Sequence, residues 1–167
     1  MSNVILIGMP ACGKSINGVV MAKTMRKSFV DTDMMIQEAE DYSLQEIIDG
    51  KGNDYFRQVE EEVLCGMEVK NAVVSTGGSA IYYDSAMQHM KENGVVVYLQ
   101  VSLKTIEERL SNIKTRGVTM EKGATIASLY EERIPLYEKY ADITIQSDGM
   151  TVEETVEAII DAVEAWK

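Results

Sequence analysis

The chain has 167 residues, of which 46% are hydrophobic, and its 27 acidic residues outnumber its 16 basic ones to give a net charge of -11. This composition suffices for one hydrophobic core, so a single domain over residues 1–167 is expected. A diffuse negative field repels nucleic-acid backbones and anionic membranes, so neither is expected as a partner. There is no signal peptide and no run of ~18 apolar residues, which favours a cytoplasmic location.

Five apolar segments are predicted strands. They lie at residues 4–7, 29–30, 73–75, 95–101 and 143–145, and segments with helical spacing separate them. The last of these segments, at 152–163, carries an apolar stripe whose expected role is packing. Alternating strands and helices are typical of the α/β class, a parallel sheet wrapped by helices. In such sheets ligands bind at the carboxyl ends of the strands.

The first predicted strand is followed by GMPACGKS at 8–15, which matches the phosphate-loop pattern GxxxxGK[ST]. Gly8 and Gly13 let the backbone curl so that its N–H groups face phosphate oxygens. Lys14 reaches the β- and γ-phosphates, and the Ser15 hydroxyl binds Mg²⁺. A helix that begins here adds its own free N–H groups to the anion site. The sequence therefore predicts a nucleotide site.

Two carboxylates, Asp31 and Asp33, follow the second predicted strand. They lie close to the phosphate loop if the ends of the first two strands are near each other. One carboxylate could then hold Mg²⁺ directly or through water, and the other could accept a proton from an attacking hydroxyl. The alternative for either residue is to cap the next helix.

Two further segments place polar groups near this edge. The glycines Gly77 and Gly78 after the third strand permit a close approach to a ligand, although a simple tight turn is equally compatible. Arg57 and Glu60 are three residues apart in a predicted helix, so they share a face, where a surface ion pair is the alternative to a functional role.

Residues 113–123 lose apolar periodicity and carry several basic residues, among them Arg116. This pattern predicts a mobile lid at about 111–124 that closes over the phosphates, with a plain surface connection as the alternative. Farther along, Arg133 stands two residues before Pro135, which is expected to end or kink its helix.

Five motifs in this order resemble the shikimate kinase family. They are GMPACGKS at 8–15, DTD at 31–33, FRQVE at 56–60, STGG at 75–78 and ERIPLYEKYAD at 132–142. The resemblance implies a three-layer P-loop kinase fold with a five-stranded parallel sheet. It also implies Mg²⁺-assisted phosphorylation of the 3-hydroxyl of shikimate by ATP, in aromatic amino-acid biosynthesis, by a protein that acts as a monomer.

The resemblance also implies a role for each matching residue, with Asp33 as the base, Asp31 near the metal and Arg109 against adenine. The implied catalytic residues are Lys14, Asp33 and Arg116; the nucleotide-binding residues are Gly8, Ala11, Cys12, Gly13, Lys14, Ser15, Ile16 and Arg109; the substrate-binding residues are Asp33, Arg57, Gly77, Gly78 and Arg133; the metal-binding residues are Ser15 and Asp31. Two convergent guanidiniums suit a small carboxylate, which they bind bidentately.

The chain departs from the family pattern at several positions. Ser79 replaces a third glycine, Asn53 replaces an acid, Ile16 replaces a hydroxyl residue, and Gly117-Val118 replaces Pro-Leu after the lid arginine. Two alternatives therefore stay open. One is a kinase of the same fold for another hydroxy acid or sugar acid, and the other is a regulatory protein that binds a nucleotide without catalysis.

Overall fold

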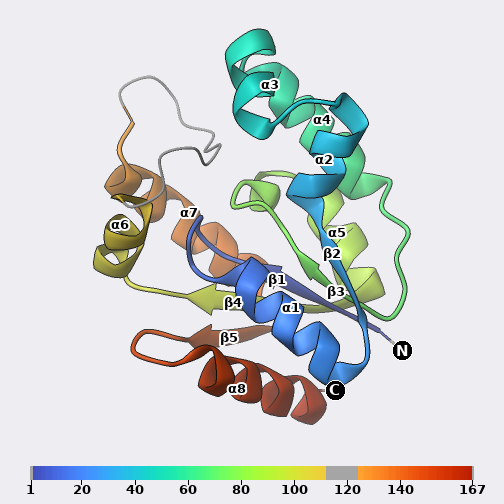
Figure 1. Cartoon of the computed structure of the whole chain (residues 1–167), viewed down its shortest axis with the longest axis vertical. Coiled ribbons are helices and arrows are strands. Elements are labelled where there is room, and N and C mark those ends of the chain that lie inside the picture. Colours follow the sequence, from blue (N-terminus) through green and yellow to red (C-terminus); the bar gives the residue numbers. More distant parts are fainter. Residues whose placement is uncertain (1, 112–123, 167) are drawn as a thin grey trace.

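Five parallel strands form one sheet in the order β2-β3-β1-β4-β5 (Figure 1). The strands are β1 (Asn3–Ile7), β2 (Ser28–Asp31), β3 (Ala72–Ser75), β4 (Gly94–Gln100) and β5 (Ile143–Gln146). The computed structural model describes residues 2–111 and 124–166, so Arg116 and residues 112–123 of the predicted lid lie outside the described residues. The predicted α/β class, with its five parallel strands, is confirmed.

Helices cover both faces of the sheet (Figure 1). On one face lie α1 (Lys14–Met25) and α8 (Val152–Ala165), and on the other lie α5 (Asp84–Asn93) and α7 (Ile126–Tyr140). The short α6 (Leu103–Ser111) packs against α7. A group of three helices, α2 (Thr32–Glu40), α3 (Leu44–Lys51) and α4 (Asn53–Cys65), extends from one end of the sheet, and the 3-10 turn η1 (Ala80–Tyr82) follows β3.

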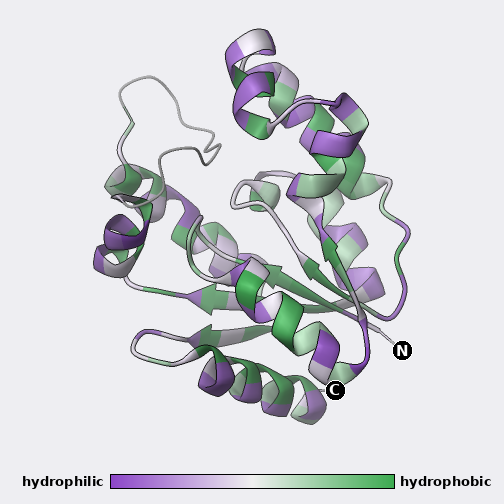
Figure 2. Cartoon of the chain, viewed as in Figure 1, coloured by the Kyte–Doolittle hydropathy of each residue, from purple (hydrophilic) through white to green (hydrophobic). Residues whose placement is uncertain are grey.

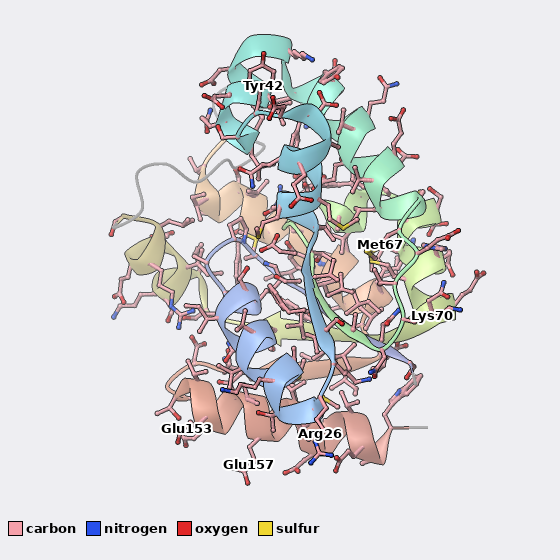
Figure 3. All side chains as sticks on the ribbon, turned by 45° about the vertical axis from the view of Figure 1, so that its right-hand side comes forward. Arg26, Tyr42, Met67, Lys70, Glu153 and Glu157 are labelled. Atoms are coloured by element: carbon pink, nitrogen blue, oxygen red, sulfur yellow. The ribbon has the colours of Figure 1, made fainter. Side chains whose placement is uncertain are left out.

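The central strands β1, β3 and β4 are mainly apolar, with polar residues at their ends, whereas the helices carry apolar and polar residues on different sides (Figure 2). A central strand of a parallel sheet is buried on both faces, which explains the continuous apolar runs. A second, smaller core lies among α2, α3 and α4; its buried members are Ile36, Leu44, Ile47, Phe56 and Val59. Figure 3 shows Tyr42 at the outer tip of these helices and Glu153 and Glu157 pointing outward from α8. Over residues 2–111 and 124–166, no helix has both the length and the apolarity needed to cross a membrane.

The expectation that Pro135 ends or kinks its helix is wrong as regards the end, because α7 continues five residues beyond it to Tyr140. A proline inside a helix removes one backbone hydrogen bond and costs roughly 3 kcal/mol. Packing offsets this cost: Tyr137 and Tyr140 are buried, and the Tyr137 ring stacks on Tyr98 at 5.0 Å between centroids. Local propensity is therefore overridden by the side chains that α7 buries against the sheet.

The start of β4 leaves no room for a side chain. A Cβ atom at Gly94 would lie 2.3 Å from the carbonyl oxygen of Asn3 on the paired strand and 2.7 Å from Cδ1 of Ile5. We therefore expect Gly94→Ala to lower the free energy of unfolding by about 2–3 kcal/mol, because backbone of the central strand must move. Urea denaturation measures this. At Gly50, in α3, the described residues leave the Cβ position open, so Gly50→Ala should be neutral or stabilising by about 0.5–1 kcal/mol; equal stability of the two variants would contradict the prediction.

Candidate active site

A cavity of about 530 Å³ opens at the carboxyl ends of the strands. Five segments line it: the phosphate loop with the first turn of α1, the start of α2, the turn after β3, α6, and the connection from β5 into the start of α8. Ten of the residues singled out from the sequence line this cavity, and they are Ala11, Cys12, Gly13, Lys14, Ser15, Ile16, Asp33, Gly77, Gly78 and Arg109. The structure thus brings together residues that are separated by almost 100 positions in the chain.

The phosphate loop is built on backbone conformations that favour glycine. Gly8 has φ 151° and Gly13 has φ 102°, both in the range that side chains disfavour. Gly13 is the N-cap of α1, and because it has no side chain, the first N–H groups of the helix have no side-chain cap. Uncapped N–H groups at a helix N-terminus bind anions.

Lys14 lies within this loop and is largely buried. Its ammonium donates hydrogen bonds to the carbonyl oxygens of Gly8 at 2.7 Å and Met9 at 2.9 Å. These contacts hold the charge at the cavity wall, beside the helix N-terminus. The Lys14 ammonium and the N-terminus of α1 therefore both produce positive potential at this part of the cavity wall, although the protein as a whole is acidic.

Ser15, in the first turn of α1, contacts Asp31 at the end of β2, although β3 lies between β1 and β2 in the sheet. The Ser15 hydroxyl donates to Oδ2 of Asp31 at 3.2 Å and lies 3.3 Å from the hydroxyl of Ser75, which pairs with Asp31 across β2 and β3. Oδ1 of Asp31 accepts from the backbone N–H groups of Asp33 and Met34, so Asp31 also caps α2. Asp31 therefore caps α2 and also lies next to the phosphate loop, so the two alternatives for this residue are compatible. Hydroxyl and carboxylate oxygens are hard ligands, so this donor set fits Mg²⁺, which takes few protein ligands and keeps water and phosphate as the others.

Asp33 and Glu60 approach Gly77 from two sides. A Cβ atom at Gly77 would lie 2.7 Å from Oδ1 of Asp33 and 3.0 Å from Oε2 of Glu60. The Gly77 N–H donates to the Thr32 hydroxyl at 3.2 Å, which ties this turn to the start of α2. A side chain at position 77 would push the two carboxylates away, so glycine fixes the place of Asp33 on the cavity wall.

Arg133 is buried beside Gly78, with 1% of its surface exposed. Its Nη1 atom would lie 2.7 Å from a Cβ at Gly78, and its Nε donates to the Tyr82 hydroxyl at 3.2 Å. The Tyr137 hydroxyl donates to the Gly78 carbonyl at 2.6 Å. This helix face therefore holds a guanidinium directly behind the turn that lines the cavity.

The remaining substrate candidate, Arg57, lies on α4 and is about one-third exposed. It forms an ion pair at 3.6 Å with Asp54, one turn earlier in the helix. Neither Arg57 nor Arg133 is among the described residues that line the cavity, and Gly8 and Asp31 also lie outside its wall. The cavity wall thus contains residues of the phosphate loop, whereas neither arginine is part of it.

The cavity also contains residues that the sequence analysis missed, among them Met150 and Val152. Arg109 reaches the phosphate loop from α6, where its Nη1 donates to the Ala11 carbonyl at 2.9 Å. The cavity wall also includes Ile16, Met150 and Val152, whose side chains are 64%, 41% and 38% exposed. Val152 belongs to the stripe to which the sequence analysis assigned only packing. Its exposure at the cavity could not be read from helical spacing, but the turn residues before α8 marked this connection as a loop near the strand ends.

Glu60 is buried, and its burial is the main reason why its pKa is raised to about 7. Hydrogen bonds from the Ser79 and Tyr83 hydroxyls oppose this rise, while the nearby Asp33 carboxylate adds to it. The sequence analysis placed Glu60 on one helix face with Arg57 and left a surface ion pair open as the alternative to a functional role, because spacing within a helix does not tell which face is buried.

The raised pKa of Glu60 predicts a loss of stability with rising pH. The folded-state value of about 7 exceeds the reference value of 4.5, so between these values the folded protein binds more protons than the unfolded chain. From about pH 5 to pH 8 this group should lower the free energy of unfolding by roughly 3 kcal/mol. Glu60→Gln should remove that decline in urea denaturation, whereas Glu157→Gln on the outer face of α8 should keep it. If the free energy of unfolding of Glu60→Gln declined with pH as in the unmodified protein, other titrating groups would be responsible for the decline.

The sheet order, the phosphate loop and the cavity at the strand ends define a P-loop kinase. The sequence profile of the family described as shikimate kinase matches residues 10–164. The chain belongs to the shikimate kinase family.

Individual relatives agree with this assignment. A shikimate kinase of Sulfurihydrogenibium sp. is 37% identical over 161 residues, which are 96% of this chain and 96% of that protein. The crystal structure of shikimate kinase from Aquifex aeolicus has 33% identity and a TM-score of 0.83, covering 97% of this chain and 96% of its own. Shikimate kinase from Acinetobacter baumannii, solved in complex with shikimate, has 25% identity and a TM-score of 0.89, covering 99% and 94%.

Proposed function

We propose that the protein transfers the γ-phosphoryl group of ATP to the 3-hydroxyl of shikimate. The observation that carries this proposal is the pair of groups around the Gly77–Gly78 turn. Asp33 lies beside Gly77 on the cavity wall and the buried Arg133 lies beside Gly78, and this arrangement supports Asp33 as the base and Arg133 as a cation for the substrate carboxylate. The relative that was solved with shikimate supports the choice of acceptor.

The phosphate end of the site binds and orients the nucleotide. Backbone N–H groups at the start of α1 and the Lys14 ammonium bind the β- and γ-phosphate oxygens. Ser15 and Asp31 would hold Mg²⁺, which supplies neutralisation of the phosphate charge when it is bound. Arg109, together with Ile16 and the apolar residues of the β5–α8 connection, would enclose the adenine.

At the acceptor end, Asp33 takes the proton of the attacking hydroxyl and so raises its nucleophilicity. Arg57 and Arg133 bind the carboxylate of the substrate, and their planar guanidiniums fix its orientation. Arg116 would complete the charge around the transferred group; it lies outside the described residues. We further propose that the protein acts as a monomer, as one domain, in the cytoplasm.

The first test is ADP release from Mg-ATP, measured with a coupled assay, with shikimate, without acceptor, and with a panel of other hydroxy acids and sugar acids. Turnover that requires shikimate is expected. Turnover with a panel member but not with shikimate would show that the protein is a kinase for a different acceptor. Binding of ATP without turnover on any acceptor would favour a regulatory protein that only binds the nucleotide.

A further inference from the structure

The Ser79 side chain faces α4 and not the cavity. Its hydroxyl donates a hydrogen bond to Oε1 of Glu60 at 2.5 Å, and the residue is buried. Thr76, Gly77 and Gly78 line the cavity, whereas Ser79 is not among the described residues that do so. This departure from the family's third glycine therefore adds a hydrogen bond between the segment that follows Gly78 and α4.

Glu60 receives a second hydroxyl on the same oxygen. The Tyr83 hydroxyl donates to Oε1 at 2.9 Å, and both donors come from the segment that surrounds η1. The charged groups that act on Glu60 from other elements are Asp33 at the start of α2 and Arg133 on α7. The other carboxylate oxygen, Oε2, would lie 3.0 Å from a Cβ atom at Gly77. Glu60 thus connects α4 to the turn that separates the proposed base from the proposed carboxylate-binding arginine.

We propose that Ser79 is a positioning residue, which acts with Tyr83 to hold Glu60 as a carboxylate against Gly77 and thereby fixes the distance between Asp33 and Arg133. This inference rests on the proposed function for its effect on turnover. The contact itself is independent of any acceptor. When Glu60 binds a proton it loses its charge, its attraction to Arg133 weakens, and the turn loses the support that sets its place.

The two hydroxyl donors favour the charged form of Glu60, because hydrogen bonds to an ion are stronger than those to its neutral form. Removal of one donor from a charged group corresponds to a change in proton affinity of about tenfold, or about one pH unit. Both Ser79→Ala and Tyr83→Phe should therefore move the titration of Glu60 to higher pH by about one unit. Ser79→Thr keeps the hydroxyl and should leave the titration in place.

The experiment measures two quantities on the full chain. The first is the titration midpoint of Glu60, followed by NMR of ¹³C-labelled glutamate carboxyl groups and assigned with Glu60→Gln. The second is the acidic limb of the pH profile of kcat/KM for shikimate. We expect both midpoints to rise together in Ser79→Ala and Tyr83→Phe, and to stay unchanged in Ser79→Thr and in Ser85→Ala, a nearby hydroxyl whose contact is with Cys65.

Two results would overturn the inference. If the titration midpoint of Glu60 were the same in Ser79→Ala and in the unmodified protein, the Ser79 hydrogen bond would not stabilise the charged form of Glu60. A midpoint that rises while the acidic limb stays in place would separate Glu60 from the chemistry. Failure of the proposed function would show differently, as absence of shikimate turnover in the unmodified protein, and the NMR midpoints would still decide the role of Ser79 in holding Glu60.

Discussion

Asp33→Asn is expected to lower kcat by about 10²–10⁴-fold while the affinity for Mg-ATP stays within about twofold. A positioned general base contributes about that factor, and asparagine keeps the size of the side chain but cannot accept the proton. Asp33 lies on the cavity wall beside Gly77 and is not part of the phosphate loop at 8–15, which we propose binds the nucleotide. Steady-state kinetics with saturating shikimate, together with equilibrium titration of a fluorescent ATP analogue, measure the two quantities separately.

Asp161→Asn is the matched control for this change, because Asp161 is an exposed carboxylate on α8. It should alter neither kcat nor nucleotide affinity. Turnover that is undiminished in Asp33→Asn would remove Asp33 as the base. Loss of ATP binding along with turnover would instead point to damage at the phosphate loop.

Arg133→Ala is expected to raise KM for shikimate by roughly 100-fold, since charge-assisted hydrogen bonds contribute about 1.5–3 kcal/mol. The buried guanidinium also donates to the Tyr82 hydroxyl and lies 5.3 Å from the Tyr82 ring, so the variant should lose stability as well. Arg133→Lys separates these effects. It keeps the positive charge but lacks the planar fork that binds a carboxylate bidentately, so KM should still rise, by about tenfold.

Lys139→Ala provides the control on the same helix, because the Lys139 ammonium lies over the Tyr140 ring at 4.9 Å and away from Gly78. Its KM for shikimate should equal that of the unmodified protein. If KM were unchanged in both Arg133 variants, the carboxylate site would have to be sought elsewhere, with Arg57 as the first candidate.

The sequence by itself determined the class of the fold and the phosphate end of the site. The strands of a parallel sheet are buried on both faces, so their apolar runs stand out in the sequence without knowledge of their neighbours. The phosphate loop is equally local, since its glycines, lysine and serine act within eight consecutive residues. The order of the strands was not local information: β3 lies between β1 and β2, and Asp31 reaches Ser15 across it.

Only the tertiary structure decided the orientation of the residues around the acceptor. The sequence placed Glu60 on one face of a helix, but only packing shows that this residue is buried against Tyr83 and Ser79. The replacement of glycine by Ser79 is likewise explained only by the structure, in which the Ser79 hydroxyl faces α4. Val152 was an ordinary member of an apolar stripe until the cavity exposed it. The physical reason is the same in each case. Burial and hydrogen-bond partners are set by segments 19 or more positions away, as in the Ser79–Glu60 contact, and no spacing within one helix or turn contains that information.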